Sequence, residues 1–258
     1  MTTSLENPML DFETNAAGTL NLLECVRKYS KESTFIYSST NKVYGDLSAL
    51  HYEETSSRYK CMEYPNGFPE TPLLVLKTPY GISKSTADSY ALEYSRTYKP
   101  KAVVLRYSSL YVERQFAPVD QGRIGRLIGE ALSFKRNKNA KVITISGNGK
   151  QVRDILYVKD AVDLYLKLAY NIDKASGEVF NVGGGNNNSL SIFELFGLLE
   201  EVLDVNLEIK KIPARKDDQE VLISDNTKIT QKIGWKASTC IKEGFKRMIS
   251  WVSQYGGA

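Results

Sequence analysis

The stretch that decides the fold is Thr78-Pro79-Tyr80-Gly81-Ile82-Ser83-Lys84. It opens a segment, residues 79–98, in which small and aromatic side chains recur at helical spacing. Proline suits the first turn of a helix, because the N–H that it lacks would have no partner there. Tyr80 and Lys84 are four residues apart, so a helix carries both on one face. We therefore predict a helix that places a phenol and an ammonium side by side.

The segment upstream of this helix is typical of a buried strand that ends in hydroxyl groups. Residues 33–38 are rich in apolar and β-forming side chains, and Ser38, Ser39 and Thr40 follow in a row. Open α/β sheets bind their ligands at the carboxyl ends of the strands. Thr40 is therefore expected at a ligand-binding edge, with Ser38 and Ser39 lining the approach.

These side chains together can move a hydride to or from the carbon of an alcohol. Removing the hydride requires removal of the hydroxyl proton, which a phenolate can accept. Free tyrosine titrates near a pKa of about 10, and a lysine one helical turn away should lower that value. The pattern predicts Tyr80 as the base, Lys84 as its charged partner and Thr40 as the group that hydrogen-bonds the reacting oxygen. The alternative is an exposed tyrosine–lysine pair without a catalytic role.

The remaining segments alternate between helical and extended patterns. This alternation predicts an α/β fold with a parallel sheet covered on both faces. We assign a dinucleotide-binding part to about 1–110 and 155–185, and a substrate lobe to about 111–154 and 186–258. The long polar insert at 46–78 should be functional or carry small structure of its own. The expected helices are 11–30, 79–98, about 123–134, 160–170, 191–203 and 244–255, and the expected strands are 33–38, 101–106, 142–145, 178–182 and 207–212.

Composition excludes several functional classes. The net charge of +4 is spread along the chain, which favours small anions mildly and is a poor argument for nucleic acid. Cys25, Cys61 and Cys240 have neither metal-ligand spacing nor a disulfide framework. His51 is the only histidine, so Ser-His-Asp or Cys-His machinery that needs a second imidazole elsewhere in the chain is excluded. Without a signal-like or membrane-spanning stretch, we expect a cytoplasmic protein with no membrane partner.

Five segments resemble the extended short-chain dehydrogenase/reductases that modify nucleotide sugars, the NAD-dependent epimerase/dehydratase family. They are residues 15–24, 38–45, 80–84, 147–154 and 180–184, and they follow the family's order over nearly the whole chain. The resemblance implies a Rossmann-type sheet with a small C-terminal substrate lobe, a tightly held NAD, a nucleotide-sugar substrate and a possible homo-oligomer. It also implies the roles of individual residues. These are Tyr80, Lys84 and Thr40 for catalysis; Ser38, Ser39, Tyr80, Lys84, Tyr107 and Ser108 for the cofactor; and Thr40, Asn41, Ser109, Arg153, Arg215 and Asp218 for the substrate.

Within the family, the chain is most similar to members that epimerise the second carbon of a CDP-dideoxyhexose through a 2-keto intermediate. The supporting stretches are 39–46, 58–59, 65–67, 114–117, 120–122 and 146–154. Related 4,6-dehydratases carry an Asp-Glu pair after the hydroxyl residue, whereas Asn41 and Lys42 stand here and cannot supply a carboxylic acid. The alternatives are an epimerase or dehydratase for another nucleotide sugar, or a non-catalytic remnant that binds nucleotide sugars.

One family feature is missing from the sequence. Family members begin with a strand and a glycine-rich turn that receives the pyrophosphate. Met1 matches a position after the family's fourth strand, and the glycines at 147–149 and 183–185 lack the required spacing. We therefore expect a sheet without its N-terminal strands, no adenosine half of the NAD site, and weak NAD binding. Val112 stands where the family usually has glycine after Tyr111, which should affect the loop near the nicotinamide.

Overall fold

The structure, a computed structural model, describes residues 2–115, 122–136, 142–213 and 219–255. Its central sheet has three parallel strands in the order β1-β4-β8, namely β1 (Thr34–Thr40), β4 (Lys101–Tyr107) and β8 (Val179–Val182). Thr40 pairs with Tyr107, and Tyr107 pairs with Val182, so the carboxyl ends of the three strands share one edge. The predicted α/β fold with a parallel sheet is confirmed.

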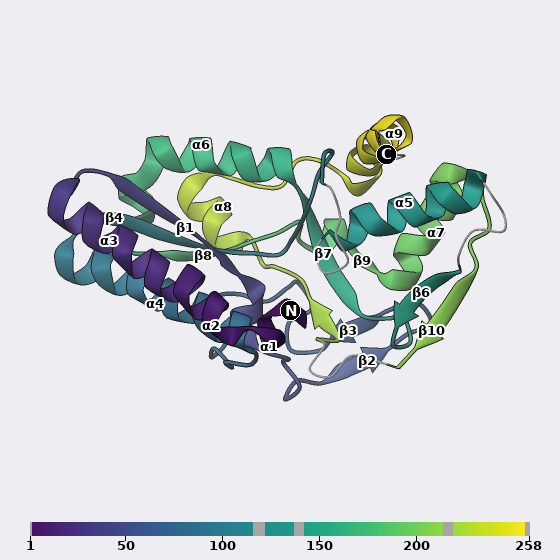
Figure 1. Cartoon of the computed structure of the whole chain (residues 1–258), viewed down its shortest axis with the longest axis horizontal. Helices are drawn as coiled ribbons and strands as arrows, with labels where there is room; N and C mark the ends of the chain where they lie inside the picture. The colour runs from purple at the N-terminus through teal and green to yellow at the C-terminus, as the bar shows by residue number, and fades with distance from the viewer. Residues whose placement is uncertain (1, 116–121, 137–141, 214–218, 256–258) are drawn as a thin grey trace.

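Helices cover both faces of this sheet (Figure 1). One face is covered by α3 (Gly18–Tyr29) and α4 (Pro79–Tyr98), which bury Leu23, Ala87 and Ala91 against Val104. The other is covered by α6 (Val158–Ala175) and α8 (Thr227–Ile233), which pack on Val103 and its neighbours. Because strand side chains alternate between faces, Val103 and Val104 of β4 pack against different helices, and the strand is buried on both sides.

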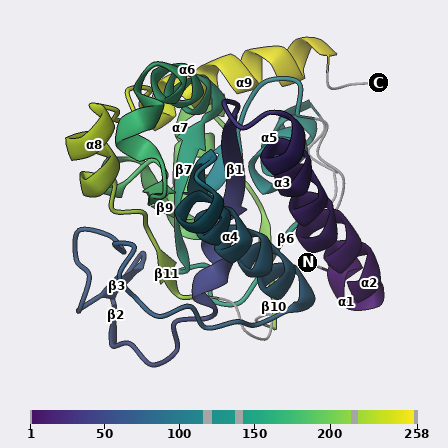
Figure 2. The same ribbon diagram turned by 90° about the vertical axis from the view of Figure 1, so that its left-hand side faces the viewer.

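The N-terminal end of α3 is part of a longer helical segment that is not regular. It comprises α1 (Thr2–Glu6), α2 (Pro8–Asp11) and a π-helix, η1 (Phe12–Ala17), which runs directly into α3. Figure 2 shows this segment beside α4. In place of the predicted single helix at 11–30, the wide turn at 12–17 separates two α-helical stretches.

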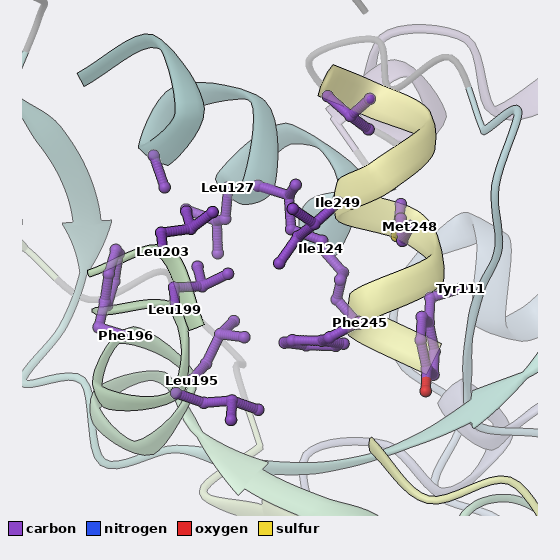
Figure 3. Packing of buried hydrophobic residues seen from close by; sticks show 14 of the residues in the cluster. Tyr111, Ile124, Leu127, Leu195, Phe196, Leu199, Leu203, Phe245, Met248 and Ile249 are labelled. Carbon is purple, nitrogen blue, oxygen red and sulfur yellow. The ribbon is translucent and has the colours of Figure 1, made fainter. Parts of the chain in front are cut away.

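The substrate lobe is built around a second sheet. Strand β7 (Val152–Tyr157) pairs in parallel with β5 (Ser109–Tyr111) and β11 (Val221–Leu222), and antiparallel with β9 (Ser189–Ser191). A parallel pair, β6 (Ile143–Ser146) and β10 (Ile209–Ile212), lies beside α5 (Arg123–Arg136) and α7 (Ile192–Leu203). Figure 3 shows the lobe's own core, where α5, α7 and α9 (Ile241–Tyr255) bury Leu127, Leu199 and Phe245.

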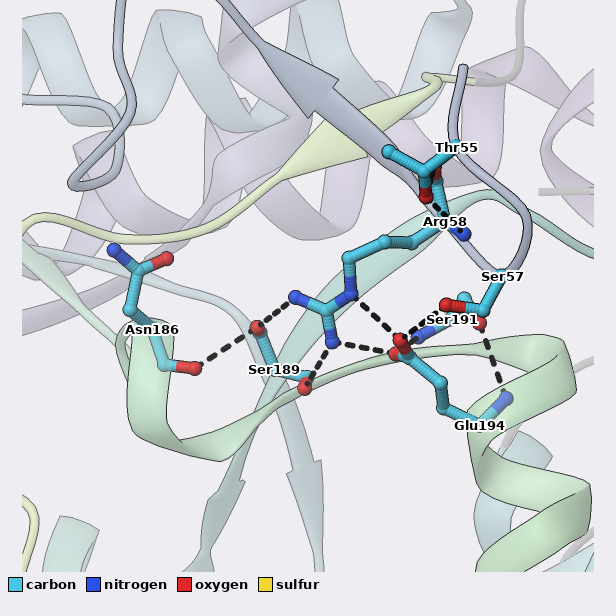
Figure 4. Close-up of polar contacts among 7 residues, drawn as sticks. All are labelled: Thr55, Ser57, Arg58, Asn186, Ser189, Ser191 and Glu194. Carbon is cyan, nitrogen blue, oxygen red and sulfur yellow. Dashed lines mark hydrogen bonds and ion pairs between the residues drawn. The ribbon is translucent and has the colours of Figure 1, made fainter. Parts of the chain in front are cut away.

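The insert at 46–78 packs on the substrate lobe, although we assigned it to the dinucleotide-binding part. It contains the hairpin β2 (Tyr52–Glu54) and β3 (Tyr59–Cys61) and follows the 3-10 turn η2 (Asn41–Tyr44). Phe68 of the insert packs with Val152 and Val221 of the lobe in one cluster. Polar contacts reinforce this packing: Arg58 donates from Nε and Nη2 to Glu194 in the first turn of α7, at 2.8 and 2.5 Å (Figure 4). A polar loop gave no sequence signal for these long-range contacts.

Candidate active site

The first turn of α4 is held in place by its own cap and by contact with η2. Thr78 is its N-cap, and the Thr78 Oγ1 accepts a hydrogen bond from the Gly81 N–H at 3.2 Å. Pro79 occupies the first helical position. Gly81 lies against η2, since a Cβ there would meet the carbonyl oxygen of Lys42 at 3.1 Å. The turn that carries Tyr80 is therefore held directly against the turn that follows β1.

Tyr80 and Thr40 meet at the carboxyl end of β1. Thr40 is buried with 9% of its surface exposed, its Oγ1 accepts from the Lys42 N–H at 3.3 Å, and it lies close enough to the Tyr80 phenol to lower its pKa. Burial raises the pKa of Tyr80, Thr40 lowers it, and the negative charge of Asp11 raises it further. The net pKa lies above that of free tyrosine, so Tyr80 is a neutral phenol at pH 7. The predicted lowering by Lys84 is therefore wrong for the protein without ligands.

Lys84 points toward β1. Its Nζ donates to the main-chain carbonyl of Ser38 at 2.5 Å and lies 4.4 Å from the ring centroid of Tyr37. Burial lowers the pKa of Lys84 to about 8, partly opposed by the charge of Asp88.

The predicted cofactor residues separate into two groups. Ser38 is exposed and its hydroxyl bonds the Tyr165 hydroxyl of α6, which stacks on Tyr107. Ser39 faces the interior and donates to Asp88 at 3.0 Å. It serves a buried ion pair, so it does not line the approach as we predicted. Alternation of side chains along β1 explains the difference between the two neighbouring serines.

The ion pair beneath Ser39 was not predicted. Arg106 Nε donates to Asp88 at 2.8 Å, and Nη1 donates to the Tyr44 hydroxyl at 3.0 Å. Tyr44 in turn donates to Asn181 at 2.8 Å. Both charged groups are almost fully buried and hydrogen-bonded on several sides, as buried charges require. This network joins β1, α4, β4 and β8 directly below the candidate site.

A second buried group lies where β4 and β8 end. Asp154 of β7 is fully buried and accepts from the N–H groups of Gly185 and Ser224 at 3.2 and 3.1 Å. Burial raises its pKa to about 6. A Cβ at Gly183 would lie 1.9 Å from Asp154 Oδ2 and 2.7 Å from Ser108 Oγ. Ser108, predicted to bind the cofactor, is therefore buried beside this carboxyl group.

The predicted substrate residues are only partly placed. Asn41 is half-buried in η2 next to Thr40, and Ser109 is exposed on β5. Arg153 is half-buried on β7, and its Nη1 donates to the Val152 carbonyl at 2.7 Å. Arg215 and Asp218 lie outside the described residues. Of these predicted residues, Thr40 lies beside Tyr80.

Asn15 is a site neighbour that sequence reasoning missed. It lies in the π-helix and donates from Nδ2 to Ser83 Oγ at 3.0 Å, while Ser83 donates to the Tyr80 carbonyl at 3.0 Å. Asn15 began the first family-like segment, which was the available signal. Single turns of π-helix are frequent at functional sites. This pair of bonds ties the irregular N-terminal helix to the turn that holds Tyr80.

The described residues fit one end of a nicotinamide cofactor and no metal. Lys84, Ser38 and Tyr80 form a polar corner with hydroxyl, carbonyl and ammonium groups at the edge of the sheet. A ribose needs such donors and acceptors. Within the part of the chain that the structure describes, no cluster of metal-ligating side chains is found, and no helix is long and apolar enough to cross a membrane.

The sequence matches a known family over almost its full length. The family described as GDP-mannose 4,6 dehydratase matches residues 1–248. The chain belongs to this NAD-dependent epimerase/dehydratase family. The resemblance of the five sequence segments is thereby confirmed.

Named relatives in the family are epimerases and dehydratases. The chain is 47% identical over 253 residues to CDP-paratose 2-epimerase of Salmonella typhi. The alignment covers 98% of this chain and 75% of that protein. The chain is also 29% identical over 264 residues to dTDP-glucose 4,6-dehydratase of Escherichia coli, covering 96% and 68%.

Solved structures in the family show the same fold. UDP-glucose 4-epimerase of Thermotoga maritima, solved with UDP-glucose, is 30% identical with a TM-score of 0.81, covering 98% of this chain and 74% of that one. dTDP-glucose 4,6-dehydratase of Bacillus anthracis, solved in complex with NAD, is 26% identical with a TM-score of 0.74, covering 95% and 69%.

Proposed function

We propose that the chain is a nucleotide-sugar epimerase that acts on the second carbon of a CDP-dideoxyhexose. The observation that carries this proposal is the contact of Tyr80 with Thr40 at the edge of the sheet. The 47% identity to a CDP-paratose 2-epimerase supports the choice of carbon and nucleotide. Asn41 and Lys42, directly after Thr40, favour epimerisation over elimination of water, because neither can act as a carboxylic acid.

In the proposed reaction, Tyr80 moves a proton and Thr40 orients the sugar. Thr40 hydrogen-bonds the 2-hydroxyl. Tyr80, as the phenolate that the positive charge of a bound nicotinamide would favour, takes the proton of that hydroxyl as the carbon–hydrogen bond breaks, leaving a 2-keto sugar. NAD, when bound, would supply the hydride acceptor and donor for this change of configuration. Tyr80 then gives the proton back to the oxygen, so no net oxidation results. Lys84 and Ser38 would hold the nicotinamide ribose.

Substrate anchoring is proposed for Arg153, Arg215, Asp218, Asn41 and Ser109. Guanidinium groups bind pyrophosphate oxygens through paired hydrogen bonds, which lysine cannot match. Asp218 suits a ribose hydroxyl. A second candidate function is binding of a nucleotide sugar without catalysis.

The test is Tyr80→Phe in the full chain with CDP-paratose and NAD supplied. We expect epimerisation to fall by at least about 100-fold, because the proton acceptor is lost while the ring remains. Epimerisation is read by NMR of the sugar C2 proton. The matched control is Tyr90→Phe, an exposed tyrosine of the same helix, which should leave turnover unchanged. Equal turnover in Tyr80→Phe and wild type would refute the mechanism, and CDP-paratose binding with no wild-type turnover would favour the binding protein.

A further inference from the structure

Thr78 has the most unusual backbone near the site. Its φ is +65° and its ψ is 145°, and it immediately precedes Pro79 and Tyr80. A β-branched residue at positive φ is a genuine outlier, and this part of the map is close to the region used almost only by glycine. A threonine here stores strain that a glycine would not.

The neighbouring contacts explain why the backbone must turn at this residue. Val75 passes directly over Gly45, where a Cβ would meet the Val75 carbonyl at 2.4 Å. Lys77 is tied to Asp46 by an ion pair. Gly81, four residues further along, is packed on the Lys42 carbonyl. The chain is thus fixed on both sides of a short stretch that must change direction and begin a helix.

Pro79 leaves Thr78 as the residue that adjusts. Proline holds its own φ near −65° and excludes helical ψ for the residue before it. The ψ of 145° at Thr78 agrees with that restriction. The remaining freedom is the φ of Thr78, which takes the positive value. The Thr78 hydroxyl then caps the Gly81 N–H, and its carbonyl accepts from the Ile82 N–H at 3.0 Å.

We propose that Thr78 is a positioning residue, whose strained backbone and capping hydroxyl set the first turn of α4 so that Tyr80 reaches Thr40. This inference rests on the proposed function, since it concerns how the proposed base is placed. The strain then has a role. Glycine would relax the backbone, but would also allow α4 to begin in more than one direction. Stability and catalysis should therefore respond in opposite directions.

Three variants separate the strain from the cap. Thr78→Gly removes both, Thr78→Val keeps the strain and removes the hydroxyl, and Thr78→Ser keeps the hydroxyl. We expect Thr78→Gly to raise Tm by about 2–4 °C, since glycine relieves the strain and its loss of the capping hydroxyl costs little stability. Thr78→Val should lower Tm, and Thr78→Ser should resemble wild type. Thr86→Val, which removes a hydroxyl bonded to the Ile82 carbonyl in the same helix, is the control.

Placement of Tyr80 is read in the chain without ligands. In protein with ¹³Cζ-labelled tyrosine, Thr40→Val should shift the Tyr80 resonance at pH 7, which is assigned by its loss in Tyr80→Phe. That shift should disappear in the Thr78→Gly background and persist with Thr86→Val. The kcat of Thr78→Gly should fall about 10- to 100-fold with KM nearly unchanged.

The outcomes divide clearly. A Thr40→Val shift of the same size in wild type and Thr78→Gly overturns the inference, as does a Thr78→Gly variant that loses Tm and turnover together. Absence of turnover in wild type would count against the proposed function alone, because the Tm and NMR results still decide the role of Thr78.

Discussion

At the scale of single residues, burial sets the acidity of the groups around the site. Tyr80 and Lys84 are both shifted toward their neutral forms, the phenol upward and the ammonium downward. Desolvation is the largest cause in each case, and for Lys84 the charge of Asp88 opposes it only in part. A bound ligand with charge at this edge of the sheet would therefore change both pKa values strongly.

Asp154 should make stability depend on pH. Its folded pKa of about 6 exceeds the ordinary 3.8, so the folded protein binds this proton more tightly than the unfolded chain. The contribution to stability is full below the unfolded value and is lost as pH rises through about 6. We expect the unfolding free energy of wild type, relative to Asp154→Asn, to fall by about 3 kcal/mol from pH 3.5 to pH 7.5.

Denaturant titrations of the two proteins over this pH range measure the difference. Subtracting the Asn variant removes the titration of all other groups that the two proteins share. Parallel pH curves for the two proteins would show that Asp154 titrates normally and is not desolvated in solution.

At the scale of elements, Gly183 allows β7 and the end of β8 to approach. A Cβ at this position would lie within 2.7 Å of Asp154, Ser224 and Ser108. We expect Gly183→Ala to lower the unfolding free energy by about 1–3 kcal/mol or more, because overpacking displaces buried polar groups. Gly197→Ala in α7 is the control. It has no atom within 4 Å of the new methyl group, and it should stabilise the helix by about 0.5–1 kcal/mol.

Chemical denaturation of both alanine variants provides the comparison. Equal effects of the two substitutions would mean that the loop at 183–185 can move away from Asp154 without cost.

The insert and α7 are joined by an ion pair that should stabilise the protein measurably. Arg58 and Glu194 are each about 25% exposed, and Ser189 also accepts from the guanidinium. We expect a double-mutant cycle of Arg58→Met and Glu194→Gln to give a coupling of about 1–2 kcal/mol, because the hydrogen bonds are charge-assisted and partly shielded from water.

Arg96 and Glu93 offer a matched control on the surface of α4. They form the same two-bond arrangement, but are 74% and 50% exposed, so the coupling should be much smaller than that of Arg58 and Glu194. Equal couplings for both pairs would mean that the insert is not held rigidly on the lobe.

At the scale of the whole molecule, the sequence of the 258-residue chain leads to a prediction about its affinity for the cofactor. We expect the 258-residue chain to bind NAD with a Kd above about 100 μM, because the sequence offers polar groups for the nicotinamide ribose and no glycine-rich turn for the pyrophosphate. Isothermal titration with NAD measures this affinity, with Lys84→Met as the control that should weaken it further. A Kd near 1 μM would contradict the prediction.

Local sequence patterns predicted those helices and strands whose bounds are set by their own residues. The helix at 79–98 was predicted with its bounds as observed, because Thr78 and Pro79 mark its start. Strand β4 ended one residue beyond prediction. The short strands β5, β9 and β11 were missed, since two or three residues carry no periodicity and owe their form to β7. Strand β7 itself and helix α8 were also missed.

The sequence predicted the site residues whose positions follow from single elements, and missed those that depend on pairing in space. Tyr80 and Thr40 meet because each is fixed by its own element, and both elements were recognised. Ser39 was misplaced because hydroxyl groups in a row gave no sign of which faced the interior. Asp88 and Arg106 were missed because each lies in a regular element, and their pairing depends on the spatial neighbourhood of α4 and β4.

The π-helix at 12–17 has a consequence for how the chain tolerates changes in length. Within the wide turn, Asn15 donates to Ser83 of α4. After the turn, Glu24 accepts from the Tyr94 hydroxyl of α4 at 2.8 Å, so both halves of the segment dock on this helix. Each residue of a regular helix adds about 100° of rotation. Deleting one residue from the wide turn would restore an ordinary helix, yet would swing Asn15 or Glu24 off its contact. Insertions and deletions in this segment should therefore destabilise the protein, even where each remaining side chain is unchanged.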